Sequence, residues 1–427
     1  MIDALTDFLK DSIVQNLRQL TGGNLKLTPP GNLSAGNNLD DLRRFNISTV
    51  LKIVHHERSI SRSDLSIRTG LNRSTISALI GELTSQGLVN EISDKKNKRV
   101  GRPSTVVVAN QNAIAIAVNP ESDAVNIGVI GLGGYVHKQS RFETTGAPTI
   151  AETIKITNAI IDGLTSVSKE NFQIIGIGLA IPELIRKEDG LIGSSHHLEW
   201  KEVSIIQLIE SSTGFKTSAG NEAFLSTLAE QVFGSGVGIK DMVFINGGSS
   251  GIAGGIVSGG QLMRGHKGYA GEMGHTRVAL TGGVDSANVV GTVEAEVSRE
   301  KLLSLLNLKI ADYDQFDYAL RTSKSHAVLS EVGRQLEYLA LAISNFINLL
   351  NPELIILGGF LGTIYSMDTK KVQKIVAINT LKPSYESVRI SRAALGVNQV
   401  VLGAAELVFM NFLYDPAGPE FTKSKIN

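Results

Sequence analysis

One local pattern occurs twice after residue 110 of this 427-residue chain. Residues 113–119 and 125–130 predict two strands joined by a tight turn, and residues 241–245 lead through the glycine-rich segment 247–255 into a strand at Ile256. Two further elements are expected, a buried strand at 174–180 and a helix at 218–233. Strands that alternate with helices and glycine turns are typical of an α/β protein. We therefore expect an α/β fold with two similar lobes.

Two short helices separated by a glycine turn are predicted before this region. They follow a helical pattern that runs from Asp40 to about Arg58. Ser61, with Asp64 three residues later, can cap a helix that ends at Gly70. Asn72 can cap a second helix that ends at Gly87 and would bury Ile76, Leu79, Ile80 and Leu83. Such a pair is a helix-turn-helix, whose second helix enters the major groove of DNA.

The outward face of this predicted motif carries short hydrogen-bond donors and guanidinium groups, which suit phosphates and base edges. The expected DNA contacts of the helices are Arg62, Asn72, Arg73, Ser74, Thr75 and Ser77. Predicted strands at 88–91 and 105–109 enclose a basic loop, which we interpret as a wing suited to a minor groove. Its expected contacts are Lys95, Lys96, Lys98, Arg99, Gly101 and Arg102. A merely solvated basic hairpin is the alternative, but the order of cap, turn, helix and wing favours DNA.

Charge supports a polyanionic partner for this part of the chain. The formal net charge is zero, with 41 basic and 41 acidic residues. Residues 43–104 hold twelve Lys or Arg and five Asp or Glu, which is +7 there and therefore −7 in the remainder. A basic segment on an otherwise acidic chain indicates that one part meets a polyanion.

Composition excludes several classes of site. The chain has no cysteine, which excludes disulfides, thiol catalysis and cysteine-built zinc sites. Residues 1–20 lack the pattern of a signal peptide, and no 18 apolar residues run together. We expect a cytoplasmic protein that does not bind membranes.

The predicted domains are a helix and linker at 1–38, a winged helix-turn-helix at 39–110 and a two-lobed region at 111–427. The lobes are expected at about 111–235, together with a C-terminal helix, and at about 236–404. Residues 2–20 predict an amphipathic helix, either a docking or dimer-contact helix or one that packs on its own domain.

Several motifs, taken in order, resemble the ROK family (repressor, open reading frame, kinase). Besides the winged helix they are Gly101-Arg-Pro103, Gly271-Glu-Met-Gly-His275, Asn351-Pro-Glu-Leu-Ile-Ile-Leu-Gly-Gly359, and Leu395-Gly396 with Gly403-Ala-Ala405. The resemblance covers residues from about 42 to 412. It implies an actin-like fold of two ribonuclease H-like lobes that bind a sugar and, in the kinases, a nucleotide.

The kinase motifs of that family are altered here. Where the kinases carry Asp-x-Gly-Gly-Thr, this chain has Asn119-Pro-Glu-Ser-Asp123, and the carboxylates of Glu121 and Asp123 would repel a triphosphate. The Asn-Asp pair that supplies the catalytic base corresponds to Asn221-Glu222, whose carboxylate is one methylene longer. The resemblance therefore implies a ROK domain without a catalytic residue, a nucleotide cofactor or kinase activity.

The sugar-contact positions are better retained. By resemblance, the expected ligand contacts are Asn221, Glu222, Glu272, His275 and Glu294. Carboxylates, an imidazole and an amide suit a polyol, because each hydroxyl both donates and accepts a hydrogen bond. The alternative is that Glu272 and His275 only brace a loop.

The family's structural zinc site is also altered. Its three cysteine positions correspond to Asp285, Ala287 and Thr292, so we expect no metal here and a segment 279–290 that is either mobile or held by other packing. His196 and His197 replace part of another family motif. They are read as surface residues, with a metal pair as the alternative.

Taken together, the sequence predicts a DNA-binding regulator, most simply a repressor of carbohydrate genes, controlled by a sugar or sugar derivative. Its expected partners are double-stranded DNA, the effector and further copies in a homodimer or homotetramer. Two alternatives stay open: a sugar kinase that phosphorylates a hexose with ATP, and a DNA-binding regulator controlled by a protein partner.

Overall fold

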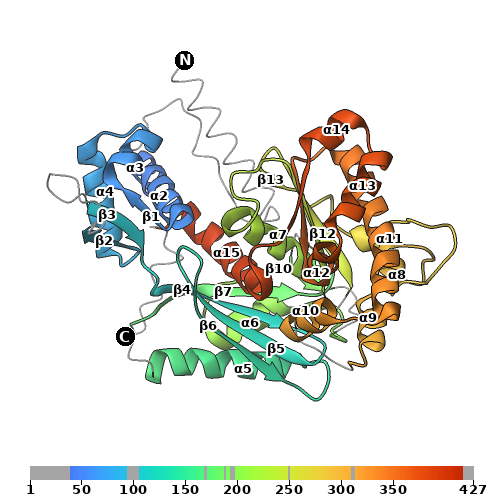
Figure 1. Ribbon diagram of the computed structural model, residues 1–427. Coiled ribbons are helices and arrows are strands. Elements are labelled where there is room, and N and C mark those ends of the chain that lie inside the picture. Colours follow the sequence, from blue (N-terminus) through green and yellow to red (C-terminus); the bar gives the residue numbers. More distant parts are fainter. Residues whose placement is uncertain are drawn as a thin grey trace. The chain divides into compact units, whose positions relative to one another are not determined.

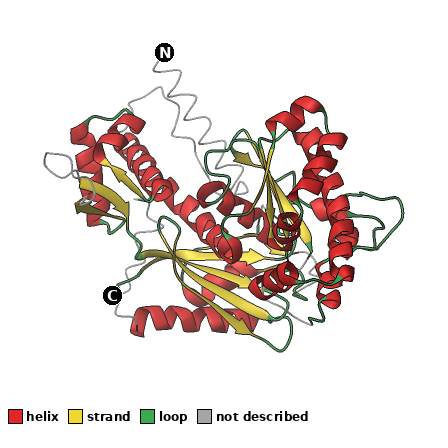
Figure 2. Cartoon of the chain, in the orientation of Figure 1, coloured by secondary structure: helices red, strands yellow, loops and turns green. Residues whose placement is uncertain are grey.

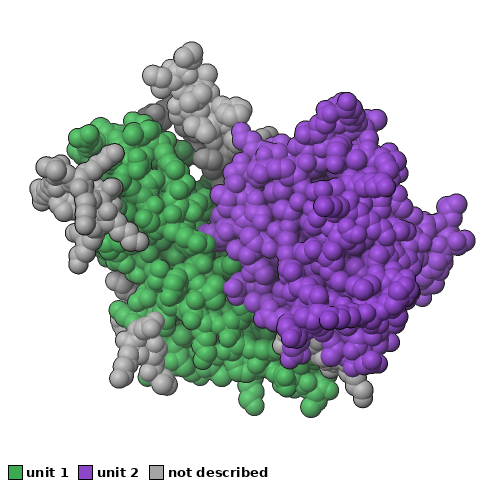
Figure 3. All heavy atoms as spheres, viewed as in Figure 1, with its two compact units in different colours: residues 1–221, 401–427 green, residues 222–400 purple. Residues whose placement is uncertain are grey.

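A computed structural model describes residues 39–93, 105–167, 171–186, 189–192, 198–248, 251–308 and 313–416 (Figure 1). The predicted N-terminal helix and linker, the predicted wing, and His196 with His197 lie outside these residues. The chain divides into two compact units, Met1–Asn221 with Val401–Asn427 and Glu222–Val400 (Figure 3). The domain boundaries that we predicted from sequence stay predictions.

The N-terminal part of unit 1 combines three helices with a small sheet. The helices are α2 (Leu39–Glu57), α3 (Arg62–Thr69) and α4 (Arg73–Ser85), and the strands are β1 (Ser59–Ser61), β2 (Val89–Ser93) and β3 (Thr105–Ala109), in the order β1-β3-β2. Four apolar residues of α2 are fully buried, namely Ile47, Val50, Leu51 and Val54. In α4 the predicted apolar face is the buried one. The three-residue strand β1 was not predicted, because it is too short to show alternation.

The rest of unit 1 is built on a mixed five-stranded sheet in the order β10-β7-β4-β5-β6. The strands are β4 (Ala113–Pro120), β5 (Ala124–Gly131), β6 (Tyr135–Glu143), β7 (Gln173–Ile181) and β10 (Thr217–Asn221). The predicted hairpin of β4 and β5 is present, and β7 pairs with β4 in parallel. Helices α5 (Ile150–Asp162) and α6 (Ile205–Thr213) share one apolar core with the sheet (Figure 1). A short pair, β8 (Leu191–Ile192) and β9 (Val203–Ser204), precedes α6.

Helix α15 (Gln399–Tyr414) packs directly on the backbone of this sheet. A Cβ at Gly178 of β7 would lie 2.0 Å from the carbonyl oxygen of Ala404, and one at Gly128 of β5 would lie 2.9 Å from Cβ of Val401. Real Cβ atoms do not approach other atoms so closely. Glycines on β5 and β7, the strands on either side of β4, therefore form the surface on which α15 rests, a use of strand glycine that allows close approach.

Unit 2 repeats the plan of a five-stranded sheet with helices beside it, in the order β13-β12-β11-β14-β15 (Figure 2). Its strands are β11 (Met242–Gly247), β12 (Ile252–Ser258), β13 (Gln261–Leu262), β14 (Leu354–Gly358) and β15 (Arg389–Arg392). Its helices are α7 (Glu222–Phe233), α8 (Val293–Glu296), α9 (Arg299–Leu305), α10 (Tyr313–Thr322), α11 (His326–Leu350), α12 (Gly359–Met367), α13 (Thr369–Asn379) and α14 (Lys382–Ser387). Val243 and Ile245 of β11 share a core with α11, α12 and α13.

Two predicted elements of this region have different bounds in the structure. Residues 218–221 are strand rather than helix, because they pair with β7 as part of β10. The second strand of unit 2 begins at Ile252 and not at Ile256. Gly255 pairs with Phe244 within β12, and only glycine fits there because a Cβ would be 2.3 Å from Oγ1 of Thr227 in α7. A glycine-rich segment that looks like a turn in sequence is thus partly a strand under a helix.

Among the described residues, one helical segment is long and apolar enough by composition to cross a membrane. It is Gly396–Tyr414, and 67% of its most apolar window is buried inside the structure. Its apolar character is that of a core helix.

Replacement of Gly178 by alanine tests the close packing of α15. Gly178→Ala should lower the free energy of unfolding by about 1–3 kcal/mol, because the new methyl group meets helix backbone rather than a side chain that can rotate away. Urea unfolding followed by circular dichroism measures this. In Gly163→Ala, where the position is helical with nothing within 4 Å, stability should rise slightly, by about 0.4–1 kcal/mol. Equal effects of the two variants would contradict the packing.

Candidate functional site

The turn between α3 and α4 is fixed by its caps. Ser61 caps α3 by accepting a hydrogen bond from the Asp64 amide at 3.0 Å, and Gly70 ends α3 with a left-handed φ of 69°. Asn72 then caps α4, and its Oδ1 accepts from the Thr75 amide at 2.8 Å and from the Ser74 hydroxyl at 2.6 Å. These bonds form the predicted helix-turn-helix and place the first turn of α4 at the surface.

The predicted DNA contacts on α4 fall on one side of the helix. Arg73, Ser74 and Ser77 are exposed and Thr75 is half-buried, whereas the apolar residues of α4 face the core. Arg73 forms no ion pair with any described residue, so its guanidinium is available to an external anion. Asn72 is exposed, but its side-chain oxygen already serves the cap.

Arg62 holds three elements together. Its Nε and Nη2 donate to the two carboxylate oxygens of Glu91 on β2, both at 2.6 Å, and its Nη1 donates to Ser77 on α4 at 3.1 Å. A bidentate arginine–carboxylate pair is geometrically specific. Arg62, which we predicted to contact DNA, therefore has a positioning role in the structure, and contact with phosphate stays a prediction.

The predicted wing residues Lys95, Lys96, Lys98, Arg99, Gly101 and Arg102 lie outside the described residues. The strands on either side are paired as predicted, with Ser93 opposite Thr105 as the last pair. The candidate DNA-binding surface that the structure brings together is thus the exposed start of α4 beside the β2–β3 pair.

Ion pairs hold the turn at residues 119–123, which we predicted by resemblance to replace a phosphate loop. Arg141 of β6 binds Glu121 through Nη1 and Asp123 through Nη2, the latter at 2.6 Å. Glu121 also accepts from Asn126 at 2.7 Å, and the buried Asn119 donates to the Ala180 carbonyl at 3.0 Å. Both carboxylates are therefore neutralised within unit 1, and the turn offers acceptors rather than the backbone donors that cradle a phosphate.

Glu272, His275 and Glu294 form a cluster within unit 2. His275 ends the 3-10 turn Met273–His275 that follows Glu272, and Glu294 lies in the first turn of α8. Glu294 accepts from the Ile252 amide at 3.0 Å and from the Ser286 hydroxyl at 2.6 Å. Gly251 has φ 123° and no room for a side chain, since a Cβ would lie 2.2 Å from Glu294. These contacts orient Glu294 beside the other two predicted residues.

The charges in this cluster shift the pKa values of Glu272 and His275. Burial raises the pKa of Glu272; His275 opposes and Glu294 adds to that rise. Burial works against protonation of His275, but the Asp285 hydrogen bond and the charges of Glu294, Asp285 and Glu272 raise its pKa overall. Carboxylates beside an imidazolium can accept and donate hydrogen bonds to a polyol.

Asp285 holds the segment that we predicted to be either mobile or held by other packing. Its side chain is fully buried, and Oδ2 contacts Nδ1 of His275 at 2.8 Å and the Thr292 hydroxyl at 3.0 Å. Oδ1 accepts from the amides of Ala287 at 3.0 Å and Val289 at 2.8 Å. The residues at the three altered zinc positions are thus joined through one carboxylate. Hydrogen bonds hold the segment, as the second alternative supposed.

Asn221 and Glu222 stand where the chain passes from unit 1 to unit 2. Asn221 ends β10 and donates to the Glu183 carbonyl at 3.1 Å, and Glu222 begins α7. Their predicted sugar contacts, like those of Glu272, His275 and Glu294, stay predictions.

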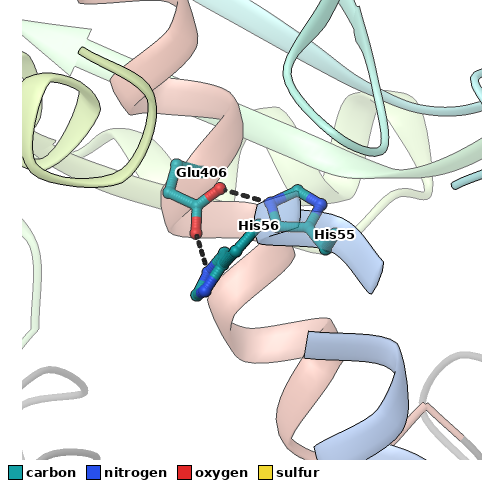
Figure 4. A group of neighbouring side chains, drawn as sticks. All are labelled: His55, His56 and Glu406. Atoms are coloured by element: carbon teal, nitrogen blue, oxygen red, sulfur yellow. Dashed lines mark hydrogen bonds and ion pairs between the residues drawn. The ribbon is translucent and has the colours of Figure 1, made fainter. Parts of the chain in front are cut away.

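Sequence reasoning overlooked one polar group, His55 and His56 at the end of α2 with Glu406 of α15 (Figure 4). Their ligand atoms lie within 4.8 Å of one another. The adjacent histidines are visible in the sequence, but nothing there points to a carboxylate 351 residues away.

Comparisons with known proteins agree with this architecture. A family model described as ROK family matches residues 115–410. The xylose repressor of Caldicellulosiruptor bescii is 26% identical, covering 88% of this chain and 98% of that protein. The glucokinase of Halalkalibacterium halodurans is 28% identical, covering 60% of this chain and 82% of that protein. The crystal structure of a ROK family transcriptional regulator, a homologue of the E. coli MLC protein, matches with a TM-score of 0.70 at 21% identity. The match covers 88% of this chain and 97% of that one. This likeness confirms the expected fold class.

Replacement of Asp285 by asparagine tests the buried carboxylate. Asp285→Asn should lower the free energy of unfolding by about 1–3 kcal/mol at neutral pH, because an amide has one oxygen: it cannot accept from Thr292 and His275 at one position and from the two backbone amides at the other. Exposed Asp314→Asn should change stability by no more than about 0.5 kcal/mol. Chemical unfolding over a pH series measures both variants.

The same comparison has a defined pH dependence. Burial opposes ionisation of Asp285, but His275 and the donors around it lower its pKa overall. The stability that Asp285 contributes is therefore present above its pKa in the unfolded chain, about 3.9, and is lost as the pH falls through its pKa in the folded protein. The pKa of His275 is raised, so the stability that its charged form contributes is present below about pH 6.5 and is lost as the pH rises through the pKa of His275 in the folded protein. The deficit of Asp285→Asn should therefore be greatest between about pH 4 and 6.5. A deficit that does not vary with pH would contradict the ion pair.

Proposed function

The chain belongs to the ROK family, and on that premise we propose that it is a sugar-responsive transcriptional repressor that binds DNA through α4 and the wing. The observation that carries the proposal is the exposed Arg73, which has no ion pair among the described residues, beside Ser74 and Ser77 on a helix whose opposite face forms the domain core. A guanidinium with short donors at the start of a recognition helix can contact phosphates and base edges.

The extent of the similarity supports this function over that of a kinase. The xylose repressor is covered over 98% of its length and accounts for 88% of this chain, whereas the glucokinase accounts for 60%. The ion pairs of Arg141 with Glu121 and Asp123 occupy the turn that a kinase needs for phosphate. By resemblance, Glu222 corresponds to the family's catalytic aspartate. We therefore propose that the ROK region senses a ligand without phosphorylating it.

We propose a sugar as that ligand because Glu272, His275 and Glu294 combine acceptors with a donor. The xylose repressor makes D-xylose the first effector to test. A repressor of this kind would act as a symmetric homo-oligomer, since paired recognition helices meet successive major grooves about one helical turn apart.

DNA binding is tested with duplexes that the full-length protein enriches from a random library. Arg73→Ala should weaken binding about tenfold or more, because it removes a charged contact at the start of α4. If Arg73 contacts phosphate, the slope of affinity against salt should also fall by about 1. Fluorescence anisotropy at several salt concentrations measures both quantities. Arg321→Ala, a change of an exposed arginine in unit 2, should leave affinity unchanged. Failure to enrich any duplex would contradict DNA binding.

Effector binding is tested by thermal unfolding with D-xylose, D-glucose and N-acetyl-D-glucosamine. A sugar at a hundred times its Kd should add about 2.7 kcal/mol of stability. His275→Ala should abolish that gain, whereas His326→Ala, an exposed histidine of unit 2, should retain it. Transfer of phosphate from ATP to any of these sugars would favour the kinase instead. If neither these sugars nor their phosphates stabilise the protein, control by a protein partner becomes the better account.

A further inference from the structure

Helix α15 is shared by the two units. Its first residues, Gln399 and Val400, belong to unit 2, where the Gln399 amide donates to Oδ1 of Asn246 on β11 at 3.0 Å. From Val401 onward the helix belongs to unit 1 and rests on the glycines of β5 and β7. A single helix of 16 residues therefore has one end in the unit that holds His275 and the remainder in the unit that holds the DNA-binding helices.

The same helix contacts α2 of the winged helix along most of its length. The residues from the start of α2 meet the end of α15, and those from the end of α2 meet its middle, so the two helices run antiparallel. The contacts are an ion pair of Arg44 with Asp415, a 2.6 Å hydrogen bond from Ser48 to the Leu413 carbonyl, Lys52 Nζ at 5.8 Å from the centre of the Tyr414 ring, and a 2.7 Å contact of His55 with Glu406. Burial lowers the pKa of Lys52 to about 8.

His55 is the central residue of this junction (Figure 4). Its ring is fully buried, Nδ1 accepts from the Gly133 amide at 2.9 Å, and Nε2 contacts Oε2 of Glu406. Because the Gly133 bond requires a lone pair on Nδ1, the proton of the neutral ring lies on Nε2 and is donated to Glu406. Arg58 donates to the carbonyl of the same Gly133 at 2.9 Å. Gly133, in the turn between β5 and β6, and one carboxylate of α15 are thus held by residues at the end of α2.

The group has the residue types of a metal site but not the hydrogen bonding of one. A metal on Nε2 of His55 would require the ring proton on Nδ1, which would then face the Gly133 N–H. His56 is half-exposed, and its Nε2 lies 3.8 Å from Oε1 of Glu406, too far for a hydrogen bond. Oε1 has no hydrogen-bond partner in the described part of the chain. The arrangement favours a hydrogen-bonded contact between the helices.

We propose that His55 and Glu406 are positioning residues that make α2 move with α15, so that a change in unit 2 is transmitted to the DNA-binding helices. This inference rests on the proposed function, because it concerns how a bound effector would alter DNA binding. A buried donor that loses its acceptor is left unsatisfied, whereas the exposed ion pair of Arg44 with Asp415 contributes little. The buried bond therefore contributes more to holding the two helices together than the exposed ion pair does.

Coupling between two sites is reciprocal, so the transmission can be tested without knowing the effector. The probe is a duplex enriched from a random library by the full-length protein, and the readout is hydrogen–deuterium exchange of α15 with and without this duplex. In the wild type, DNA should slow exchange in α15 about fivefold or more. In Glu406→Leu the duplex should still bind, since the core of the winged helix is intact, but the change in α15 should disappear.

Two further variants separate the contact from general stability. Glu406→Gln keeps an oxygen that can accept from Nε2 of His55 and should retain the response. Asp415→Asn alters only the exposed end of the helix pair and should retain it as well. Without DNA, Glu406→Leu should speed exchange in α2, whereas Glu406→Gln should not.

Several outcomes would overturn the proposal. They are an α15 that does not respond to DNA in the wild type, a full response in Glu406→Leu, or equal loss in Asp415→Asn. A rise in melting temperature with ZnCl2 that His56→Ala abolishes would identify a metal site instead. If no duplex is enriched, the proposed function fails and the transmission with it; if DNA binds but α2 exchange is the same in Glu406→Leu, only the transmission fails.

Discussion

Contact between the backbone of α15 and the glycine backbone of the unit 1 sheet determines how the parts of unit 1 are joined. Because Gly178 and Gly128 leave no space for a side chain, α15 lies directly on β5 and β7 and cannot slide without opening that packing. Its other side carries Glu406 and the carbonyl of Leu413, which α2 binds. The winged helix is therefore seated on a helix whose own position is fixed by a sheet.

Positions that depart from the ROK pattern are locally compensated. At the turn that by resemblance corresponds to the kinases' phosphate loop, the carboxylates of Glu121 and Asp123 are bound by Arg141. At the altered zinc positions, Asp285 accepts from two amides and a hydroxyl while it contacts His275. In both places a buried or crowded charge has gained specific partners, which is what the low dielectric of a protein demands. The departures thus retain folded loops while they change the chemistry that the loops can support.

The sequence predicted what depends on local pattern. The caps at Ser61 and Asn72, the buried face of α4 and the β4–β5 hairpin follow from residue spacing, and the structure has all of them. Residues 218–221 were wrongly placed in a helix, because pairing with β7 decides their conformation. The partner of His55 is 351 residues away, and Asp285 is satisfied largely by backbone amides, which carry no residue signature. Local residue spacing therefore does not predict contacts between residues far apart in the sequence or hydrogen bonds from backbone amides.

The connection between β3 and β4 has a consequence for building hybrid proteins. Only residues 110–112 separate the last strand of the winged helix from the first strand of the sheet, and Asn110 bonds to the Gly87 carbonyl and the Asn112 amide. The winged helix is thus attached by a short, hydrogen-bonded connection at residues 110–112 and, separately, by the contacts of His55 and Arg58 with Gly133. If a winged helix from another protein replaced residues up to 110, the hybrid would lose α2 of this chain and, with it, the second attachment. Transfer of a functional winged helix to another protein would therefore require α2, the Gly133 turn and the facing residues of α15 to be moved together.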